Sequence, residues 1–356
     1  MEANKVALGD FSDWYSENIE TYNLYTKRVE ELIKTIIVGD EIPIHSISCR
    51  VKTLSSCIEK CQRKAYLNPS SDIMDMAGIR IIAYTSSDVK RICTLIENEF
   101  IIDKKNSMNK AELLRADRVG YISIHYVAEL HKARTKLIEY SRFKGLKCEI
   151  QIRTILQHAW AEIEHDRSYK FSGVLPIDIR RRFHLVAGVL EIMDCEFQRL
   201  SDEIDKYARE VQEKTQKGDL FDIEINSTSL PEYLQHKFPG LSISQSLNGG
   251  DKVIIEELKD FGVTTISQLD YLVTAKMFTF INNLSESEIQ ETTEDSYLGL
   301  LRDIMMLSDV DKYFKKAWKN RWTAMRKEDL TILSKFGVDT KKIMENIRFI
   351  NDDDIF

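Results

Sequence analysis

The segment from Glu149 to Lys170 constrains the fold most strongly, because its hydrophobic pattern changes from period two to a helical period. Before the change, polar and apolar residues alternate, so an extended strand would carry Glu149, Gln151 and Arg153 on one face. After Thr154, a suitable helix N-cap, apolar residues recur at helical spacing. The pattern therefore predicts a strand-to-helix unit that presents an acid, an amide and a guanidinium to one side. Taken alone, it is also typical of an edge strand with one solvated face, followed by a surface helix.

The length and composition indicate a helix-rich globular protein. A chain of 356 residues predicts two or three domains. Apolar residues make up 43% and charged residues 30%, with only 5 Pro and 14 Gly. No apolar run approaches the roughly 18 residues of a membrane span, and the first residues lack a signal-peptide core, so we expect a cytoplasmic protein. The six cysteines lack the short paired spacings of a zinc site and fit a reducing compartment.

Positive charge is concentrated in one part of the chain. Between Arg50 and Lys170 there are 22 Lys and Arg against 15 Asp and Glu, a local balance of +7. Since the whole chain carries -7, the remainder carries -14. The basic part fits an anionic ligand, and the acidic remainder argues against general coating of nucleic acid.

The periodicity upstream of Thr154 predicts a mixed α+β sheet domain. Helices are expected over residues 11–39, 54–67 and 86–99, an extended segment over 44–51, and strands over 77–84, 100–103, 121–130 and 146–153.

The pattern beyond Pro176 becomes entirely helical, and Lys217-Gly218-Asp219 interrupts it. We therefore expect four parts: an N-terminal helix that packs on the sheet domain, the sheet domain with its C-terminal helices, a linker, and a helical C-terminal module. Their expected ranges are 1–40, 41–215, 216–230 and 231–356.

Four basic and hydroxyl residues lie at the junction of the extended segment and the following helix. They are Arg50, Lys52, Ser56 and Lys60. With the chain helical beyond Thr53, Ser56 and Lys60 stand one turn apart on one face. Such an array suits a polyphosphate, with the guanidinium also able to stack on a base. A solvated helix face is the alternative interpretation.

An acid precedes the buried strand at 77–84, and an arginine lies within it. Asp75 stands just before the strand, a common place for a ligand of Mg²⁺, which prefers hard oxygen donors. Burying the charge of Arg80 in an apolar strand costs free energy unless the guanidinium contacts an anion or the face of an aromatic ring. Alternatively, the acid caps a turn and Arg80 extends outward to solvent.

The strand at 121–130 begins with an aromatic residue, a hydroxyl and an imidazole on one face. These are Tyr121, Ser123 and His125, and Gly120 before them permits close backbone approach. An aromatic platform beside an imidazole suits a nucleobase and its phosphates. Core packing of Tyr121 is the alternative.

In order and spacing, these four motifs resemble those of the RelA/SpoT synthetase domain. The tail from Trp160 to Lys170 resembles the small alarmone synthetases, which lack a hydrolase domain. The resemblance covers roughly residues 40 to 215. It implies a nucleotidyltransferase-like mixed sheet flanked by helices. It also implies transfer of the β,γ-pyrophosphate of ATP to the 3′-hydroxyl of GDP or GTP, which makes (p)ppGpp.

The same resemblance implies a role for each motif residue. The residues implied to bind ATP are Arg50, Lys52, Ser56, Lys60 and Arg80, with the two arginines on either side of the adenine. Asp75 and Glu149 would bind Mg²⁺ and act in catalysis together with Lys52, and Glu149 would help to deprotonate the attacking hydroxyl. The residues implied to bind the acceptor nucleotide are Tyr121, His125, Gln151, Arg153 and Arg118.

Four positions depart from the family pattern, and they concern the acceptor: Asp117, Arg118, Val119 and Ile122. Asp117 stands where many relatives have a lysine, and a carboxylate there would repel acceptor phosphates unless Arg115 or Arg118 replaces that lysine. The identity of the acceptor thus stays open. It is either a guanine nucleotide or, as in toxin-type relatives, an adenine nucleotide or the 3′ end of tRNA. A catalytically silent nucleotide-sensing or interaction protein is the third hypothesis.

The partners expected are therefore ATP with GDP or GTP, with tRNA as an alternative and neither DNA nor a membrane. For the C-terminal module three roles stay open: a sensor or regulator, a homo-oligomerisation element, or a partner-binding domain. Its segment from Tyr313 to Trp322 is typical either of an amphipathic helix buried against its neighbours or of an RNA-binding surface.

Overall fold

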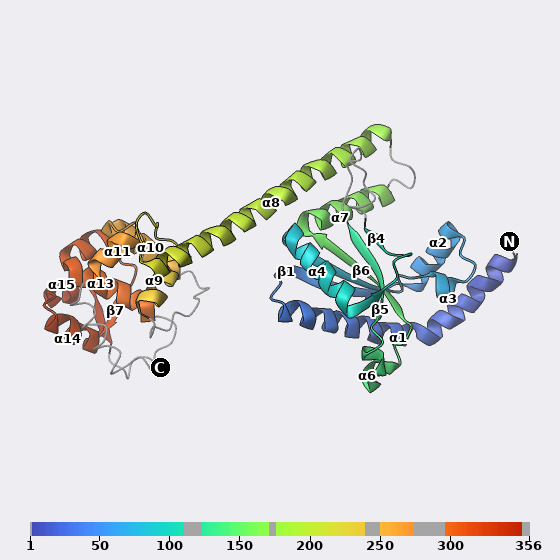
Figure 1. Cartoon of the computed structure of the whole chain (residues 1–356), viewed down its shortest axis with the longest axis horizontal. Coiled ribbons are helices and arrows are strands. Elements are labelled where there is room, and N and C mark those ends of the chain that lie inside the picture. The colour runs from blue at the N-terminus through green and yellow to red at the C-terminus, as the bar shows by residue number, and fades with distance from the viewer. Residues whose placement is uncertain (1, 110–122, 171–175, 239–249, 274–295, 351–356) are drawn as a thin grey trace. The chain divides into compact units, whose positions relative to one another are not determined.

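The computed structural model describes residues 2–109, 123–170, 176–238, 250–273 and 296–350 (Figure 1). The chain divides into two compact units, Met1–Asp202 and Glu203–Phe356. The division falls within one long helix, α8 (Ile177–Lys217). The ranges expected from the sequence for the linker and the C-terminal module remain predictions. Among the described helices, none combines the length and the apolar character that crossing a lipid bilayer requires.

A mixed sheet forms the centre of the first unit, which confirms the predicted fold class. Its strands are β1 (Ile44–Val51), β2 (Ala77–Ala83), β3 (Phe100–Ile102), β4 (Met108–Asn109), β5 (Ile124–Leu130) and β6 (Lys147–Thr154). The order is β1-β2-β6-β5-β3, and β4 pairs with β5. Strands β2 and β6 are parallel, and the other pairs are antiparallel.

Strand β6 lies inside this sheet, so the edge-strand interpretation of its alternating pattern is wrong. It pairs with β2 on one side and with β5 on the other. Its apolar residues Cys148, Ile150 and Ile152 are fully buried. The alternation in β6 therefore comes from one face that packs in the core and one face that is polar, and not from a position at the edge of the sheet.

Helices α1 and α4 bury the apolar face of the sheet. Ile33 of α1 and Ile92 of α4 belong to the same buried cluster as Ile79 and Ile150 of the strands. The helices of this unit are α1 (Glu2–Gly39), α2 (Leu54–Lys64), α3 (Pro69–Asp72), α4 (Ser86–Glu99), α6 (Ile138–Ser141) and α7 (Ile155–Lys170). With one face covered, the polar side chains of the strands gather on the other.

Local sequence explains where the helices near the polar face begin and end. Helix α2 stops at Lys64, three residues before the predicted end, because Ala65 takes a left-handed conformation with φ 52° and its N–H bonds the carbonyl of Cys61. Thr154 is the N-cap of α7, as predicted: its hydroxyl accepts from the N–H of Gln157, whose side chain accepts in return from the N–H of Thr154.

The second unit is built mainly from short helices around its own core. They are α9 (Ser229–Lys237), α10 (Gly250–Phe261), α11 (Ile266–Leu272), α13 (Ser296–Lys312), a π-helical turn (Tyr313–Ala317), α14 (Lys327–Lys335) and α15 (Thr340–Asn346). Strands β7 (Ala324–Arg326) and β8 (Arg348–Ile350) form a parallel pair, so the expected all-helical module also contains a small sheet. A strand of three residues is too short to give a readable alternation.

The apolar residues of the segment from Tyr313 to Trp322 pack on the core of the second unit, in agreement with the packing interpretation. Tyr313 and Ala317 are fully buried, and Trp318 and Trp322 pack against the core. Glu257 is also fully buried, where it accepts hydrogen bonds from Arg302 and from the hydroxyl of Tyr313.

Candidate active site

Three strands of the first unit bring charged side chains to one edge of the sheet. Because β1 is antiparallel to β2, the end of one meets the start of the other, and the N–H of Lys52 donates to the carbonyl of Met76. Strand β6 runs parallel to β2, with Glu149 beside Gly78. Asp75, Lys52 and Glu149 therefore line the same pocket although up to 97 residues separate them in sequence.

Asp75 is held by two ammonium groups from different elements. Lys52 Nζ lies 2.7 Å from Oδ2, and Lys60 Nζ on α2 lies 2.8 Å from Oδ1. Burial raises the pKa of Asp75, but the hydrogen bonds and positive charges of the two lysines outweigh burial and bring this pKa below its ordinary value. The carboxyl group is therefore ionised at neutral pH.

Glu149 is held by partners on its own strand and on β5. His125 Nδ1 lies 3.0 Å from Oε1, and Gln151 Nε2 donates to Oε2 at 2.7 Å. Burial raises the pKa of Glu149, as does the charge of Asp75, but His125 and Gln151 outweigh them and the net pKa lies below its ordinary value. A second ionised carboxylate thus stands close enough to Asp75 for the two charges to interact.

A chain of hydrogen bonds fixes the imidazole between Glu149 and Arg153. The Nε of Arg153 donates to Ser123 Oγ at 3.1 Å, and its NH2 lies 3.3 Å from His125 Nε2. A guanidinium has no acceptor, so His125 Nε2 accepts and Nδ1 carries the hydrogen that is donated to Glu149. Arg153, itself only 7% exposed, therefore sets the tautomer of His125 and the orientation of the carboxylate.

A pocket of about 200 Å³ opens beside the carboxylates on the β1 side. Its lining includes Arg50, Lys52, Arg80 and Gln151 as well as Asp75 and Glu149. Arg80 makes an ion pair of 3.0 Å with Glu162 on α7, a partner that the sequence did not reveal.

Gly78 keeps this first pocket open. It stands between Arg50 and Glu149 in the strand register, so a side chain here would project between them. Among the described residues, a Cβ at this position would meet Arg50 alone, at 3.6 Å or more, so the glycine adds no side chain to the space between Arg50 and Glu149.

A second pocket, of about 630 Å³, opens on the other side of the same two carboxylates. Asp75 and Glu149 line both pockets, so they stand where the two adjoin. The second pocket adds residues that the sequence motifs did not identify: Tyr66, Asn68, Lys105 and Asn106. Tyr66 and Asn68 lie in the loop after α2, and Lys105 and Asn106 lie in the loop after β3. Their place in these loops is the one sequence feature that could have identified them.

The structure brings most of the predicted site residues together, but not all of them. Ser56 is exposed, bonds the hydroxyl of Thr53 at 2.9 Å and lines neither pocket. His125 and Arg153 act through Glu149 and are not among the residues that line the two pockets. Tyr121, Arg118 and Asp117 lie outside the described residues.

The two carboxylates provide a donor set that suits Mg²⁺. This ion takes hard oxygen ligands and is commonly bound by one or two carboxylates together with substrate phosphates. Asp75 and Glu149 are both ionised and both face the space where the pockets adjoin. Within the described residues, no cluster of three or more His, Cys, Asp or Glu is arranged to hold a metal by protein ligands alone.

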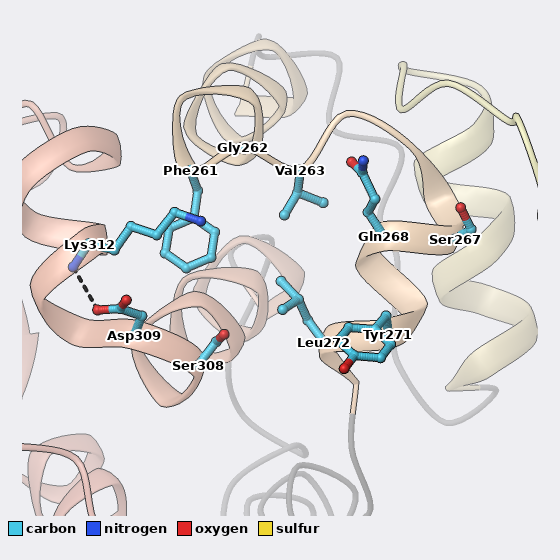
Figure 2. Close-up of a pocket in the computed structure, with 10 residues that line it drawn as sticks. All are labelled: Phe261, Gly262, Val263, Ser267, Gln268, Tyr271, Leu272, Ser308, Asp309 and Lys312. Carbon is cyan, nitrogen blue, oxygen red and sulfur yellow. Dashed lines mark hydrogen bonds between the residues drawn. The ribbon is translucent and has the colours of Figure 1, made fainter.

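Another pocket, of about 460 Å³, lies in the second unit (Figure 2). Figure 2 shows the side chain of Lys312 extending over the ring of Phe261. Its Nζ lies 4.4 Å from the centroid of that ring. Of the described residues that line it, Asp309 is the one acid, and the N–H of Lys312 donates to it. Without paired carboxylates this pocket lacks the charge arrangement found in the first unit.

Comparison with known proteins identifies the sheet unit. The family model described as "Region found in RelA / SpoT proteins" matches residues 49–173, the stretch that carries both carboxylates. Residues 49–173 form a RelA/SpoT domain. Two Bacillus subtilis proteins are similar to the chain. GTP pyrophosphokinase YjbM is 29% identical over 51% of this chain and 86% of its own length. GTP pyrophosphokinase YwaC is 28% identical over 46% of this chain and 76% of its own length.

A solved structure that is similar to the chain is that of small alarmone synthetase 1 from Bacillus subtilis. It is 25% identical and covers 55% of this chain and 99% of its own, with a TM-score of 0.46. The RelA/SpoT domain and the two curated relatives establish that the chain is an enzyme of the pyrophosphokinase type.

Proposed function

We propose that this RelA/SpoT domain transfers the β,γ-pyrophosphate of ATP to the 3′-hydroxyl of GDP or GTP. The observation that carries the proposal is the pair of pockets that adjoin at Asp75 and Glu149. A transfer between two nucleotides needs a donor and an acceptor on either side of one charged centre. The names of the two similar proteins, both GTP pyrophosphokinases, support guanine nucleotides as acceptors.

The first pocket suits the donor, ATP. Arg50 and Arg80 offer planar guanidinium groups that stack on a base, and Lys52 offers a point charge for phosphates. The charge on the phosphates during transfer is stabilised best by cations that are already in position. In this proposal, Arg80 exchanges its contact with Glu162 for the adenine, at little cost because the pair is partly exposed.

The second pocket suits the acceptor, whose phosphates would meet Lys105. During transfer the 3′-oxygen forms a bond to the β-phosphorus while the bond from that phosphorus to the α,β-bridging oxygen breaks, so AMP leaves. The hydroxyl proton is released near Glu149. Because the pKa of Glu149 is lowered, this carboxylate is a weak base, and its main contribution would be to orient the hydroxyl and to bind the cation.

Asp75 and Glu149 would hold Mg²⁺, which when bound neutralises the charge that develops on the transferred phosphates. The lysines beside Asp75 keep its carboxyl group ionised. The chain from Arg153 through His125 keeps Glu149 in position.

The test uses ATP labelled in its γ-phosphate, incubated with Mg²⁺ and with GDP, GTP, ATP or tRNA in parallel. We expect label to enter GDP or GTP with release of AMP. Asp75→Asn and Glu149→Gln should each reduce this activity by at least about 100-fold, because each removes a charge at the centre of the reaction. Glu139→Gln, which changes an exposed acid on α6, should leave the activity unchanged.

Transfer of label to tRNA or to ATP, with none to guanine nucleotides, would overturn the acceptor assignment while leaving the pyrophosphate chemistry. Tight ATP binding with no turnover on any acceptor would overturn the proposal as a whole. Circular dichroism of each variant separates loss of the site from loss of the fold.

A further inference from the structure

An acid on α7 contacts the first pocket through Arg80. Oε1 of Glu162 lies 3.0 Å from NH1 of Arg80, which lines that pocket. The side chain of Glu162 is 56% exposed and that of Arg80 is 26% exposed. Because an ion pair this exposed contributes little to stability, the fold does not require an acid at this position. The sequence motifs give Glu162 no role either.

Glu162 and Arg80 lie at the end of the first pocket that is farther from the two carboxylates. Strand β2 begins just after Asp75, and Arg80 lies three residues, or about 10 Å, beyond the start of that strand. Strand β6 runs in the same direction and leads directly into α7, which carries Glu162. A nucleotide with its phosphates at Lys52 would therefore extend its base along β2 toward Arg80 and α7.

A second polar side chain of α7, His158, lies beside Glu162. Its Nδ1 is 3.8 Å from Oε1 of Glu162, which is too long for a hydrogen bond. Within the described part of the chain, this buried Nδ1 has no hydrogen-bond partner. Burial lowers the pKa of His158, and the positive charge of Arg80 lowers it further, whereas Glu162 opposes the change. The imidazole is therefore neutral at neutral pH, and a bound group could still satisfy its Nδ1.

On the assignment of the first pocket to ATP, which belongs to the proposed function, we propose that Glu162 selects adenine by accepting a hydrogen bond from its exocyclic amine. His158 Nδ1 is the second acceptor for the same amine. In the structure an amino group, NH1 of Arg80, already lies beside Glu162 where the adenine amine would lie. When Arg80 turns the face of its guanidinium to the base, it leaves Glu162 and uncovers this place.

Position 6 of the purine distinguishes possible donors at this place. Adenine carries an amine with two N–H groups there, on the edge of the base that lies farthest from the ribose and the phosphates. Guanine and hypoxanthine carry a carbonyl oxygen, which can only accept. A carbonyl would leave Glu162 without a donor and would set two oxygen acceptors against each other. Glu162 would thus favour ATP as the donor and leave guanine nucleotides to the second pocket.

The experiment measures displacement of labelled α,β-methylene ATP from the full-length protein, with Mg²⁺ and excess GDP present. The methylene bridge prevents transfer, and the label reports on the donor site. The unlabelled competitors are α,β-methylene ATP and α,β-methylene ITP, which differ at position 6 of the purine and in the N1 proton that accompanies the carbonyl. We expect the unaltered protein to prefer the adenine analogue by at least about 30-fold.

Two variants and a control test the residues of α7. Glu162→Gln should reduce the preference to about 3-fold or less, because an amide can either accept from the amine or donate to the carbonyl. His158→Phe keeps an aromatic ring, removes the second acceptor and should reduce the preference by about 3- to 10-fold. Asp166→Asn changes an exposed acid one turn further along α7 and should keep the full preference. A general loosening of α7 would weaken both analogues alike and leave their ratio unchanged.

Equal binding of the two analogues by the unaltered protein would overturn the role of Glu162. An undiminished preference in Glu162→Gln, or an equal loss of both analogues there, would overturn it as well. The proposed function is tested separately, because no transfer takes place in this assay. A protein that prefers adenine here but transfers nothing to any acceptor would overturn the proposed function alone, and failure of the labelled analogue to bind would overturn both.

Discussion

At the scale of single residues, the site depends on pairs that hold carboxylates in their charged form. Asp75 is flanked by Lys52 and Lys60, and Glu149 by His125 and Gln151. Burial alone would raise the pKa of each acid and favour the neutral form. The neighbouring donors reverse that tendency, so both acids are ionised at neutral pH.

Replacing Lys52 by Met should raise the pKa of Asp75, since it removes one of the two charges that oppose burial. A lowered carboxyl pKa adds stability above the ordinary pKa of Asp, and this stability is lost as the pH falls through the folded-state value. Lys52→Met should thus cost about 1 to 2 kcal/mol of unfolding free energy at neutral pH. The cost should vanish in acid, where Asp75 is protonated in both proteins.

Carbon-13 NMR titration of the aspartate carboxyl groups and urea unfolding at several pH values measure the two effects. Lys90→Met, an exposed lysine on α4, provides the control and should change neither. An unaltered titration of Asp75 in the Lys52 variant would show that the pairing does not hold the charge.

At the scale of elements, the junction between β6 and α7 links the active-site strand to α8. Thr154 is fully buried, caps α7 and donates to Asp194 Oδ2 at 2.8 Å. Burial raises the pKa of Asp194, and the hydrogen bond from Thr154 offsets only part of that increase. One hydroxyl therefore supports both the start of α7 and the contact of α8 with the sheet unit.

Thr154→Val should destabilise the first unit by about 1 to 3 kcal/mol, because it removes the cap and leaves the buried carboxyl of Asp194 without its donor. Hydrogen exchange of the first-turn amides of α7 measures the effect locally, and thermal unfolding measures it for the unit. Thr154→Ser keeps the hydroxyl and should retain most of the protection. Equal loss in both variants would mean that the methyl group, and not the hydrogen bonds, carries the stability.

At the scale of the whole molecule, the chain contains two separate cores. One surrounds the sheet of the RelA/SpoT domain, and the other surrounds the helices after α8. The second core includes the buried acid Glu257, which bonds Arg302 and Tyr313. A charge buried in this way is costly to leave unpaired.

Glu257→Ala should unfold or loosen the second unit while the first remains folded. Removing one partner of a buried ion pair costs about 3 to 5 kcal/mol, a large share of the stability of a small unit. Hydrogen exchange followed by mass spectrometry should show lost protection in α10 and α13 and unchanged protection in β2 and β6. Glu256→Gln, an exposed neighbour, is the control. Loss of protection throughout both units would mean that they unfold as one.

Much of this structure follows from the sequence alone. Period-two and helical patterns are local properties, so they predicted β6 and α7, the N-cap Thr154 and the mixed sheet. Motif spacing likewise identified the acids and bases that the structure brings together, because each motif is confined to a short stretch of the chain. The predicted end of α2 and the all-helical C-terminal module were inaccurate, because short strands and left-handed caps leave little periodic signal.

Strand order and distant contacts were decided only by the tertiary structure. The inner position of β6 depends on pairing with β2 and β5, which no local pattern specifies. The same pairing sets His125 between Glu149 and Arg153, and it is the packing of α2 that brings Lys60 to Asp75. The sequence by itself determined which chemical groups this enzyme has. The folded chain decided which of them touch, since contacts across many residues depend on how whole strands pair and helices pack.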